Sequence, residues 1–267
     1  MSTPTQLSPC GYQEPKYVES PAECLFYHST DLPGFGLQVG SWDLRENVDS
    51  YLGNVNFAGK RVIDVGTASG FLAFEIEKRG GEVVAFDRLV SDSLDEAGLV
   101  PFHDYKERYG QSIEEVVNGY FDLQRKVQNS FWLTHRLLDS KVKFYCAASQ
   151  DDISEIGEAD YAFYGCVLLH LRDPLQALAR FAKLVREKLI ITEMHENIGP
   201  NAESAVMFFR PNVAQSENMA TWWYITPALL RQYLEILGFR TFEFTTHERR
   251  YLPDGGKANL FTHVASR

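Results

Sequence analysis

The stretch that most constrains the fold is residues 61–87, which reads RVIDVGTASGFLAFEIEKRGGEVVAFD. It opens with an apolar, β-branched run, as expected of a strand that is buried on both faces. A turn of small residues follows from Gly66 to Gly70, and the helix-like pattern after it ends at Gly80. A second apolar run then ends at Asp87. The pattern predicts strand, helix and parallel strand, with a turn where a ligand can approach the backbone closely.

The sequence of the small-residue turn distinguishes between two classes of nucleotide-binding site. A dinucleotide fingerprint has the form G-x-G-x-x-G, in which glycines allow close approach of a pyrophosphate. Ala68 stands at the position of the middle glycine here. Asp87, at the end of the second strand, is placed to accept both hydroxyls of a ribose. The stretch therefore indicates a nucleoside cofactor, and Ala68 weighs against an NAD-dependent dehydrogenase.

The pattern D-V-G-x-x-S-G at residues 64–70 resembles motif I of the class I S-adenosylmethionine (SAM) methyltransferases. The resemblance implies that Asp64 lies near the amino group of the cofactor and that Asp87 holds the ribose hydroxyls. It also implies that the turn passes under the sulfonium and that residues 147–152 lie beside the adenine. The candidate cofactor-binding residues are Asp64, Gly66, Thr67, Ala68, Ser69, Gly70, Asp87, Arg88, Ala148, Ser149 and Cys166.

The rest of the chain extends the same alternation. Strand-like runs lie at residues 141–146, 188–193, 239–245 and 260–265, and another starts at Ala159. Helix-like patterns separate them. Such alternation predicts an α/β fold with a doubly wound sheet and a ligand at the carboxyl ends of the first strands. With the resemblance, we expect a Rossmann-like methyltransferase fold with a mostly parallel sheet of seven strands.

The 267-residue length fits one domain with additions. We expect an N-terminal arm and cap over residues 1–58 and a methyltransferase domain over residues 59–267. That domain carries a helical insertion at about residues 89–140 and a substrate loop at about residues 194–224, because connections of this length need structure of their own. The insertion reads as one long helix or two, and either as a lid or as a cover for the sheet edge.

Aromatic side chains are concentrated in the segments that lie outside the expected sheet. Aromatic rings supply a pocket with a large contact area at low entropic cost, but they also serve to pack a long loop. Both interpretations stay open for each ring. The candidate substrate-binding residues are Trp42, Phe131, Phe208 and Trp222.

Composition excludes several classes of protein. No apolar stretch of about 18 residues is present, so we expect no membrane span. The first nine residues lack the basic and then apolar pattern of a signal peptide, and the four cysteines have no C-x-x-C spacing. We therefore expect a cytoplasmic protein with free thiols. The group Glu193, His195 and Glu196 has no recognised ligand spacing, so we expect no metal.

Two segments of the C-terminal half narrow the resemblance. Residues 166–174 and 221–230 resemble the tRNA wobble-uridine carboxymethyltransferase group and also bacterial methyltransferases of natural-product pathways. An enzyme acting on tRNA is expected to have a basic face, and the formal net charge is −10. We therefore expect methyl transfer to an oxygen or nitrogen of a small molecule, with a tRNA-modifying enzyme as the alternative and a non-catalytic SAM-binding protein as a third. The basic face would comprise Arg125, Lys126, Arg136, Arg249 and Arg250.

Two histidines are candidates for a general base. An oxygen acceptor has to lose its proton before or during methyl transfer, and histidine titrates near neutrality. His170 follows the fourth expected strand and His195 follows the fifth, so both lie on the ligand side of the sheet. A supporting role for the loop is the alternative for His170.

Overall fold

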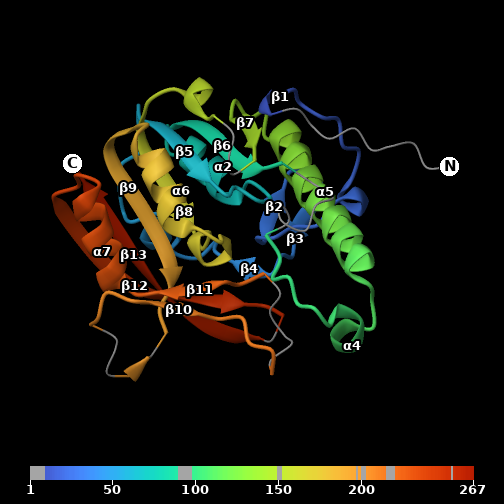
Figure 1. Ribbon diagram of the computed structural model, residues 1–267. Helices are drawn as coiled ribbons and strands as arrows, with labels where there is room; N and C mark the ends of the chain where they lie inside the picture. Colours follow the sequence, from blue (N-terminus) through green and yellow to red (C-terminus); the bar gives the residue numbers. More distant parts are fainter. Residues whose placement is uncertain are drawn as a thin grey trace.

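The computed structural model describes residues 10–89, 98–148, 152–196, 198–199, 203–214, 220–253 and 255–267. Across these ranges a central sheet of nine strands has the order β1-β7-β6-β5-β8-β9-β13-β12-β4 (Figure 1). Its strands are β1 (Gly11–Gln13), β4 (Trp42–Asp43), β5 (Arg61–Val65), β6 (Glu82–Arg88), β7 (Lys143–Ala147), β8 (Ala159–Gly165), β9 (Val185–Met194), β12 (Thr241–Tyr251) and β13 (Gly256–Ser266).

The centre of the sheet is parallel. Strands β7, β6, β5, β8 and β9 pair in parallel, whereas β13 is antiparallel to β9 and β12 is antiparallel to β13. β12 therefore runs in the same direction as β9, and both end at the same edge of the sheet. This is the expected α/β arrangement, but the expected count of seven strands was wrong. The N-terminal arm adds two short edge strands, β1 beside β7 and β4 beside β12.

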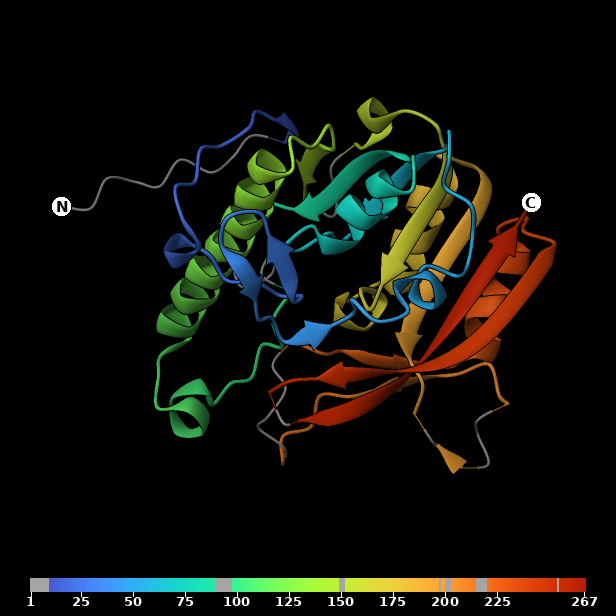
Figure 2. The ribbon, with the colours of Figure 1, turned by 180° about the vertical axis from the view of Figure 1, so that it is seen from behind.

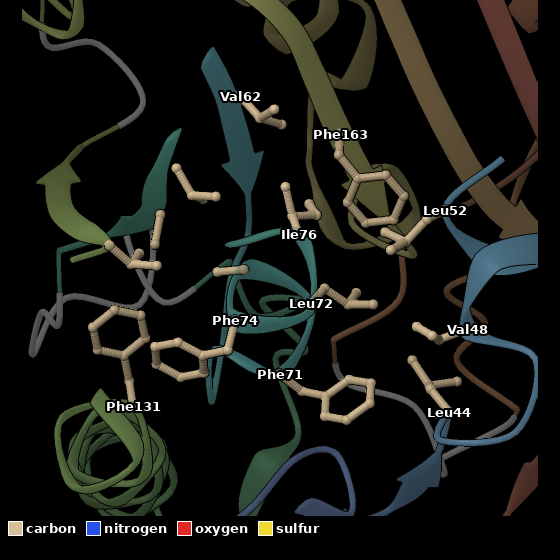
Figure 3. Packing of buried hydrophobic residues seen from close by; sticks show 14 of the residues in the cluster. Leu44, Val48, Leu52, Val62, Phe71, Leu72, Phe74, Ile76, Phe131 and Phe163 are labelled. Carbon is tan, nitrogen blue, oxygen red and sulfur yellow. The ribbon is translucent and has the colours of Figure 1, made fainter. Parts of the chain in front are cut away.

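Helices cover both faces of the sheet (Figure 2). On one face, α2 (Phe71–Lys78) and α5 (Ile113–Leu137) share a core with the N-terminal arm and α1 (Val48–Tyr51). On the other face, α6 (Pro174–Ala182) and α7 (Pro227–Ile236) share a second core. The fold is therefore doubly wound. In Figure 3, Phe131 of α5 and Phe74 of α2 meet in the first core, where their ring centroids lie 5.1 Å apart.

The insertion contains one long helix. α5 runs unbroken for 25 residues, and a capping box opens it. The Ser112 hydroxyl accepts the Glu115 N–H at 3.2 Å, and the Glu115 carboxylate accepts the Ser112 N–H at 2.7 Å. The short helix α4 (Tyr105–Tyr109) precedes it. The described part of the chain has no helix long and apolar enough to cross a membrane.

The remaining elements lie outside the main sheet. They are the hairpins β2 (Thr30–Leu32) with β3 (Gly36–Gln38) and β10 (Met207–Phe209) with β11 (Trp223–Ile225), and the 3-10 turns η1 (Pro21–Glu23), η2 (Ser154–Ile156) and η3 (Leu168–His170). A third apolar cluster joins the insertion to the segment before β11. Its buried members are Leu99, Val100, Phe102, Tyr105, Val116 and Trp222.

Candidate functional site

The turn between β5 and α2 is held tightly against the end of β6. The amides of Gly66 and Thr67 donate to the Phe86 carbonyl at 2.8 and 3.0 Å. Gly66, Ala68 and Gly70 have φ angles of 78°, 50° and 85°, which favour glycine or small residues. A Cβ on Gly66 would lie 2.5 Å from a methyl group of Val167. The turn therefore needs glycine both for its conformation and for the close approach of the loop after β8.

Asp87 is clamped at the carboxyl end of β6. Its Oδ2 accepts the Ala68 N–H at 2.8 Å, and its Oδ1 accepts the Arg88 N–H at 2.8 Å. Burial raises the pKa of Asp87, and these hydrogen bonds act in the opposite direction. Each carboxylate oxygen uses one acceptor site on the backbone and has another available. The carboxylate is thus oriented to accept two further donors.

Among the described residues, two polar oxygens beside the turn are buried without a hydrogen bond to any third group. They are Asp64 Oδ2 and Thr67 Oγ1, on side chains that are 1% and 2% exposed. Burial raises the pKa of Asp64 to about 7; the Thr67 side chain opposes this rise, and the nearby charge of Asp87 adds to it. Buried polar groups without hydrogen bonds are costly. A ligand that places N–H donors beside these oxygens would therefore gain binding free energy from hydrogen bonds to them.

The N-terminal arm lies over the turn. The Ser69 hydroxyl accepts the His28 N–H at 3.4 Å, and His28 forms a bridge to Trp42. Burial lowers the pKa of His28 to about 3, so its ring is neutral at pH 7. Gly40 passes so close to this segment that a Cβ there would lie 2.4 Å from the His28 carbonyl carbon. The arm is thus packed onto the ligand side of the sheet.

Four side chains near the carboxyl ends of the parallel strands are both deep in the protein and partly accessible. Tyr27, Asp87, Cys166 and His170 lie deep within the protein, as the burial-driven shifts in their pKa values show, yet each keeps accessible surface. A ligand can reach side chains of this kind, and we call the group formed by these four residues the recess. The structure therefore brings together the predicted cofactor residues of the turn, Asp87 and Cys166 with the predicted base His170.

The two candidate bases differ in their surroundings. His170 Nδ1 lies 2.7 Å from the Ala220 carbonyl oxygen, so Nδ1 carries the proton and Nε2 has a lone pair. Burial lowers the pKa of His170, which favours the neutral ring. His195 instead packs against Phe244 and Phe261 of the antiparallel strands, with centroid distances of 6.3 and 5.9 Å. Of the two, only His170 lies among the residues of the recess.

Arg88 leaves β6 next to Asp87 and reaches α5. Its Nη2 donates to the Tyr120 hydroxyl at 2.6 Å, and its guanidinium lies 5.1 Å from the centre of that ring. Ala148, at the end of β7, is 8% exposed. Ser149 lies outside the described residues. The adenine side of the expected site is therefore described only in part.

The four aromatic residues that were candidates for substrate binding lie in different parts of the structure. Trp42 packs against Tyr251 with a centroid distance of 4.8 Å, at the edge where β4 meets β12. Phe131 has no accessible surface and packs in the core, so its expected role in a substrate pocket is corrected. Phe208 pairs with Tyr224 in the hairpin β10–β11. Trp222 is nearly buried in the cluster that joins insertion and loop.

Several further groups of this region are buried. Glu193, at the end of β9, accepts the Leu168 N–H at 2.7 Å, and burial raises its pKa to about 8. Two tyrosines also lie here, Tyr27 of the N-terminal arm and Tyr51 of α1, and neither was a candidate from the sequence. Arg249 was expected on a basic face but is 7% exposed. Within the described ranges, no three His, Cys, Asp or Glu side chains are grouped so that they could hold a metal ion.

Comparison with solved structures identifies the class of proteins that share this fold. No protein-family model matches the chain. Among solved structures, the N-terminal domain of EvdMO1, in the presence of S-adenosylhomocysteine (SAH) and D-fucose, has a TM-score of 0.50 and 15% identity over 91% of each chain. A SAM-dependent methyltransferase from Methanosarcina mazei has a TM-score of 0.51 and 14% identity, covering 84% of this chain and 98% of the other. An O-methyltransferase family protein from Burkholderia thailandensis has a TM-score of 0.50 and 15% identity, over 84% and 56%. The chain thus has the fold of SAM-dependent methyltransferases.

Proposed function

We propose that this protein is a SAM-dependent methyltransferase that transfers a methyl group to an oxygen or nitrogen of a small molecule. The observation that carries the proposal is the clamped carboxylate of Asp87 beside the turn at residues 66–70. Its two remaining acceptor sites suit the two hydroxyls of a ribose. The shared fold with a domain solved in the presence of SAH supports the same cofactor here.

The buried oxygens beside the turn fit the amino-acid end of SAM. Among the described residues Asp64 Oδ2 and Thr67 Oγ1 have no hydrogen bond to any third group, and an ammonium group would supply donors to both. A cation at this point would also favour the charged form of Asp64, whose pKa is raised by burial. Ala148 and Cys166 complete the described part of the proposed cofactor site from the exits of β7 and β8.

The recess then positions the acceptor. SAM supplies a methyl group on a sulfonium, which passes in line to the acceptor atom. The acceptor loses one proton and leaves methylated, and SAH is released. His170 Nε2 has the free lone pair that takes this proton, because its Nδ1–H is fixed on Ala220.

The added segments enclose the acceptor side in this proposal. The arm at residues 1–58 covers the turn of the domain at residues 59–267 through His28 and Ser69. The insertion at about residues 89–140 and the loop at about residues 194–224 meet at Trp222, whose indole N–H donates to the Gly98 carbonyl at 2.7 Å. A closed cap of this kind would exclude water from methyl transfer.

Calorimetric titration with SAM, SAH and NAD tests the cofactor. We expect micromolar binding of SAM and SAH and no binding of NAD. Asp87→Ala should weaken SAH binding at least tenfold, because hydrogen bonds to charged groups contribute about 1.5–3 kcal/mol each. The matched control is Asp139→Asn, at an exposed position with φ 49° that asparagine tolerates. Binding of NAD alone, or equal SAH affinity in the Asp87 variant, would contradict the proposal.

SAH formation during acceptor screening tests the reaction. We would screen small hydroxylated metabolites first, including sugars, because the EvdMO1 domain was solved with D-fucose. Turnover on tRNA instead would establish the RNA-modifying alternative. SAH binding without turnover on any acceptor would favour the non-catalytic alternative. Of the residues expected on a basic face, Arg249 is buried, whereas Arg136 is exposed and donates to the Val18 carbonyl at 2.8 Å.

A further inference from the structure

The carboxyl group of Glu193 holds the turn η3 from the neighbouring strand β9. Glu193 is 3% exposed, and its Oε1 accepts the Leu168 N–H at 2.7 Å. Burial raises the pKa of this carboxyl group, and the N–H groups of Leu168, Leu169 and Val167 oppose the rise. Three successive amides of the chain after β8 therefore act on one buried carboxyl group.

The conformation of Cys166 shows why η3 needs contacts from another strand. Cys166 has a φ of 53°, a left-handed conformation that costs energy for a residue with a side chain. Its N–H donates to the carbonyl of Thr192, the residue before Glu193, at 2.8 Å. β9 therefore binds the chain on both sides of Val167 and keeps it in this conformation as it leaves β8.

The turn η3 also carries the contact that sets the tautomer of His170. The carbonyl oxygen of Ala220 lies 2.7 Å from His170 Nδ1. From the same segment, the Trp222 N–H donates to the Leu169 carbonyl at 2.8 Å. Glu193 thus binds the backbone of this turn, whereas Ala220 binds the ring that the turn carries. A displacement of the turn relative to Ala220 would therefore break the ring contact and release the tautomer.

The surroundings of Glu193 suit a contact with the backbone in either protonation state. The Cys166 thiol and the Tyr51 hydroxyl lie near enough to feel its charge, and both keep their protons because burial raises their pKa values. With a pKa of about 8, the Glu193 carboxyl group changes its charge in mild alkali. Both forms have an oxygen that can accept the Leu168 N–H, because a protonated carboxyl group retains its carbonyl oxygen. The contact with η3 should therefore persist on both sides of this pKa.

We propose that Glu193 is a positioning residue for His170: its carboxyl oxygen holds η3 so that the ring keeps its Nδ1–H on Ala220 and presents Nε2 to the acceptor. The inference rests on the proposed function for the role of His170 as the base, whereas the effect of Glu193 on the ring can be measured without any acceptor. It predicts that loss of this oxygen lowers kcat with little change in KM or in SAH affinity.

Spectra of the full-length protein, recorded with and without SAH, test the proposal through the tautomer of His170. Glu193→Leu removes the accepting oxygen, whereas Glu193→Gln keeps one. Long-range ¹H–¹⁵N spectra distinguish the Nδ1–H form of the ring from the Nε2–H form, and His170→Gln assigns the signal. We expect the Nδ1–H form in the wild type and in Glu193→Gln, and a mixture of both forms in Glu193→Leu. An unchanged Nδ1–H form in Glu193→Leu would overturn the proposal.

Rates with an acceptor from the screen are the second readout. Glu193→Leu should lower kcat by about tenfold or more while KM stays within about twofold, and Glu193→Gln should restore most of the loss. If Glu193→Leu does not fold, the wild type and Glu193→Gln decide. A mixture of tautomers in the wild type, or a lowered kcat in Glu193→Gln with its tautomer unchanged, would then overturn the proposal.

Asp173→Leu is the matched control. Asp173 follows His170 closely in the chain and also accepts a backbone amide, the Gln176 N–H at 2.8 Å, at the start of α6. The variant makes the same chemical change and removes a helix cap, so it should be less stable but keep the wild-type tautomer and kcat. A mixture of tautomers in Asp173→Leu as well would assign the effect to general destabilisation and overturn the proposal.

SAH affinity and the rate of His170→Gln are measured first, which separates this inference from the proposed function. A protein that binds SAH and needs His170 for turnover, but keeps its tautomer in Glu193→Leu, fails this inference only. A protein that does not bind SAH, or that keeps the wild-type rate in His170→Gln, fails the proposed function. The tautomer spectra then still decide whether Glu193 holds the ring.

Discussion

The Nδ1 atom of His170 lies 2.7 Å from the carbonyl oxygen of Ala220, so a contact between η3 and the segment before β11 fixes the tautomer of a histidine in the recess. This contact orients Nε2 as an acceptor. Burial lowers the pKa of His170, so the ring is neutral and able to accept a proton at pH 7.

The first prediction concerns His170 as the base. His170→Gln should lower kcat by about 10²–10⁴-fold, the usual range for loss of general base catalysis, with SAH affinity within twofold of the wild type. His195→Ala should stay near the wild-type rate, because its ring packs on Phe244 and Phe261. Single-turnover rates with an acceptor from the screen would measure both. Equal rates for the His170 variant and the wild type would exclude His170 as the general base.

The wild-type pH profile follows from the same contact. A base whose pKa is lowered from the ordinary histidine value is protonated only in acid, so the rate should be constant at neutral and alkaline pH and fall as the pH decreases through the lowered pKa of His170. The His170→Gln variant should lose this acid limb. A limb that persists unchanged in the variant would assign it to another group.

The second prediction concerns Asp64 and stability. Burial raises the pKa of Asp64 in the folded protein to about 7, well above the ordinary value of an aspartate, so the folded state prefers the protonated form. Stability from this group is present below the unfolded pKa and is lost as the pH rises toward 7, by up to about 4 kcal/mol. Asp64→Asn should therefore raise the melting temperature by several degrees at pH 8 and by very little at pH 4.

The same Asp64→Asn substitution should weaken SAH binding, because the proposed ammonium partner loses a charged acceptor. Calorimetry and thermal melts on one sample separate the two effects. The comparison variant Asp139→Asn, at an exposed site, should leave both properties unchanged. A variant that is less stable than the wild type at pH 8 would show that the charged form of Asp64 is already satisfied in the protein.

The third prediction concerns the turn. Gly66→Ala forces a side chain into a conformation with φ 78° and within 2.5 Å of Val167 Cγ2, so strain and overpacking combine. In Gly110→Ala the only penalty is conformational strain, because Gly110 has a φ of 66° and no atom lies within 4 Å of the added Cβ. We expect Gly66→Ala to lower the free energy of unfolding by about 1–3 kcal/mol more than Gly110→Ala. If denaturant titrations show equal losses of unfolding free energy for the two variants, the contact with Val167 does not contribute to the effect of Gly66→Ala.

The sequence predicted the elements whose signals are local. The β5–turn–α2–β6 unit follows from the apolar runs and the small residues at 66–70, and Asp87 follows from the end of the second run. Edge strand β4 has two residues, too few for any periodicity, so its pairing with β12 is visible only in three dimensions. The predicted number of strands was therefore too low, because an edge strand such as β4 pairs with a strand that lies far away in the sequence.

Side-chain roles were harder to predict than strands. Phe131 lies on the apolar face of α5, and a helical stripe gives the same signal whether it meets a core or a pocket. Here the stripe meets Phe74 and Phe144, and nothing of Phe131 is exposed. The burial of Arg249 depends on Asn47 and Ser50, about 200 residues earlier in the chain, so no local pattern could have indicated it.

The last prediction concerns the contact between insertion and loop. The Trp222 indole N–H donates to the Gly98 carbonyl at 2.7 Å, and Trp222→Phe keeps an aromatic ring but removes this hydrogen bond. A buried carbonyl without its donor costs about 1–3 kcal/mol, so residues 98–116 should exchange their amide hydrogens faster while β5 and β6 stay protected.

Trp223→Phe is the matched control, because the Trp223 indole donates to Arg172 beside η3 at 3.1 Å and not to the insertion. It should leave exchange in residues 98–116 at the wild-type rate. If both variants speed exchange there equally, the insertion depends on the packing of the whole loop and not on the single bond. If only Trp222→Phe does so, one hydrogen bond couples the insertion to the loop that also holds His170 through Ala220.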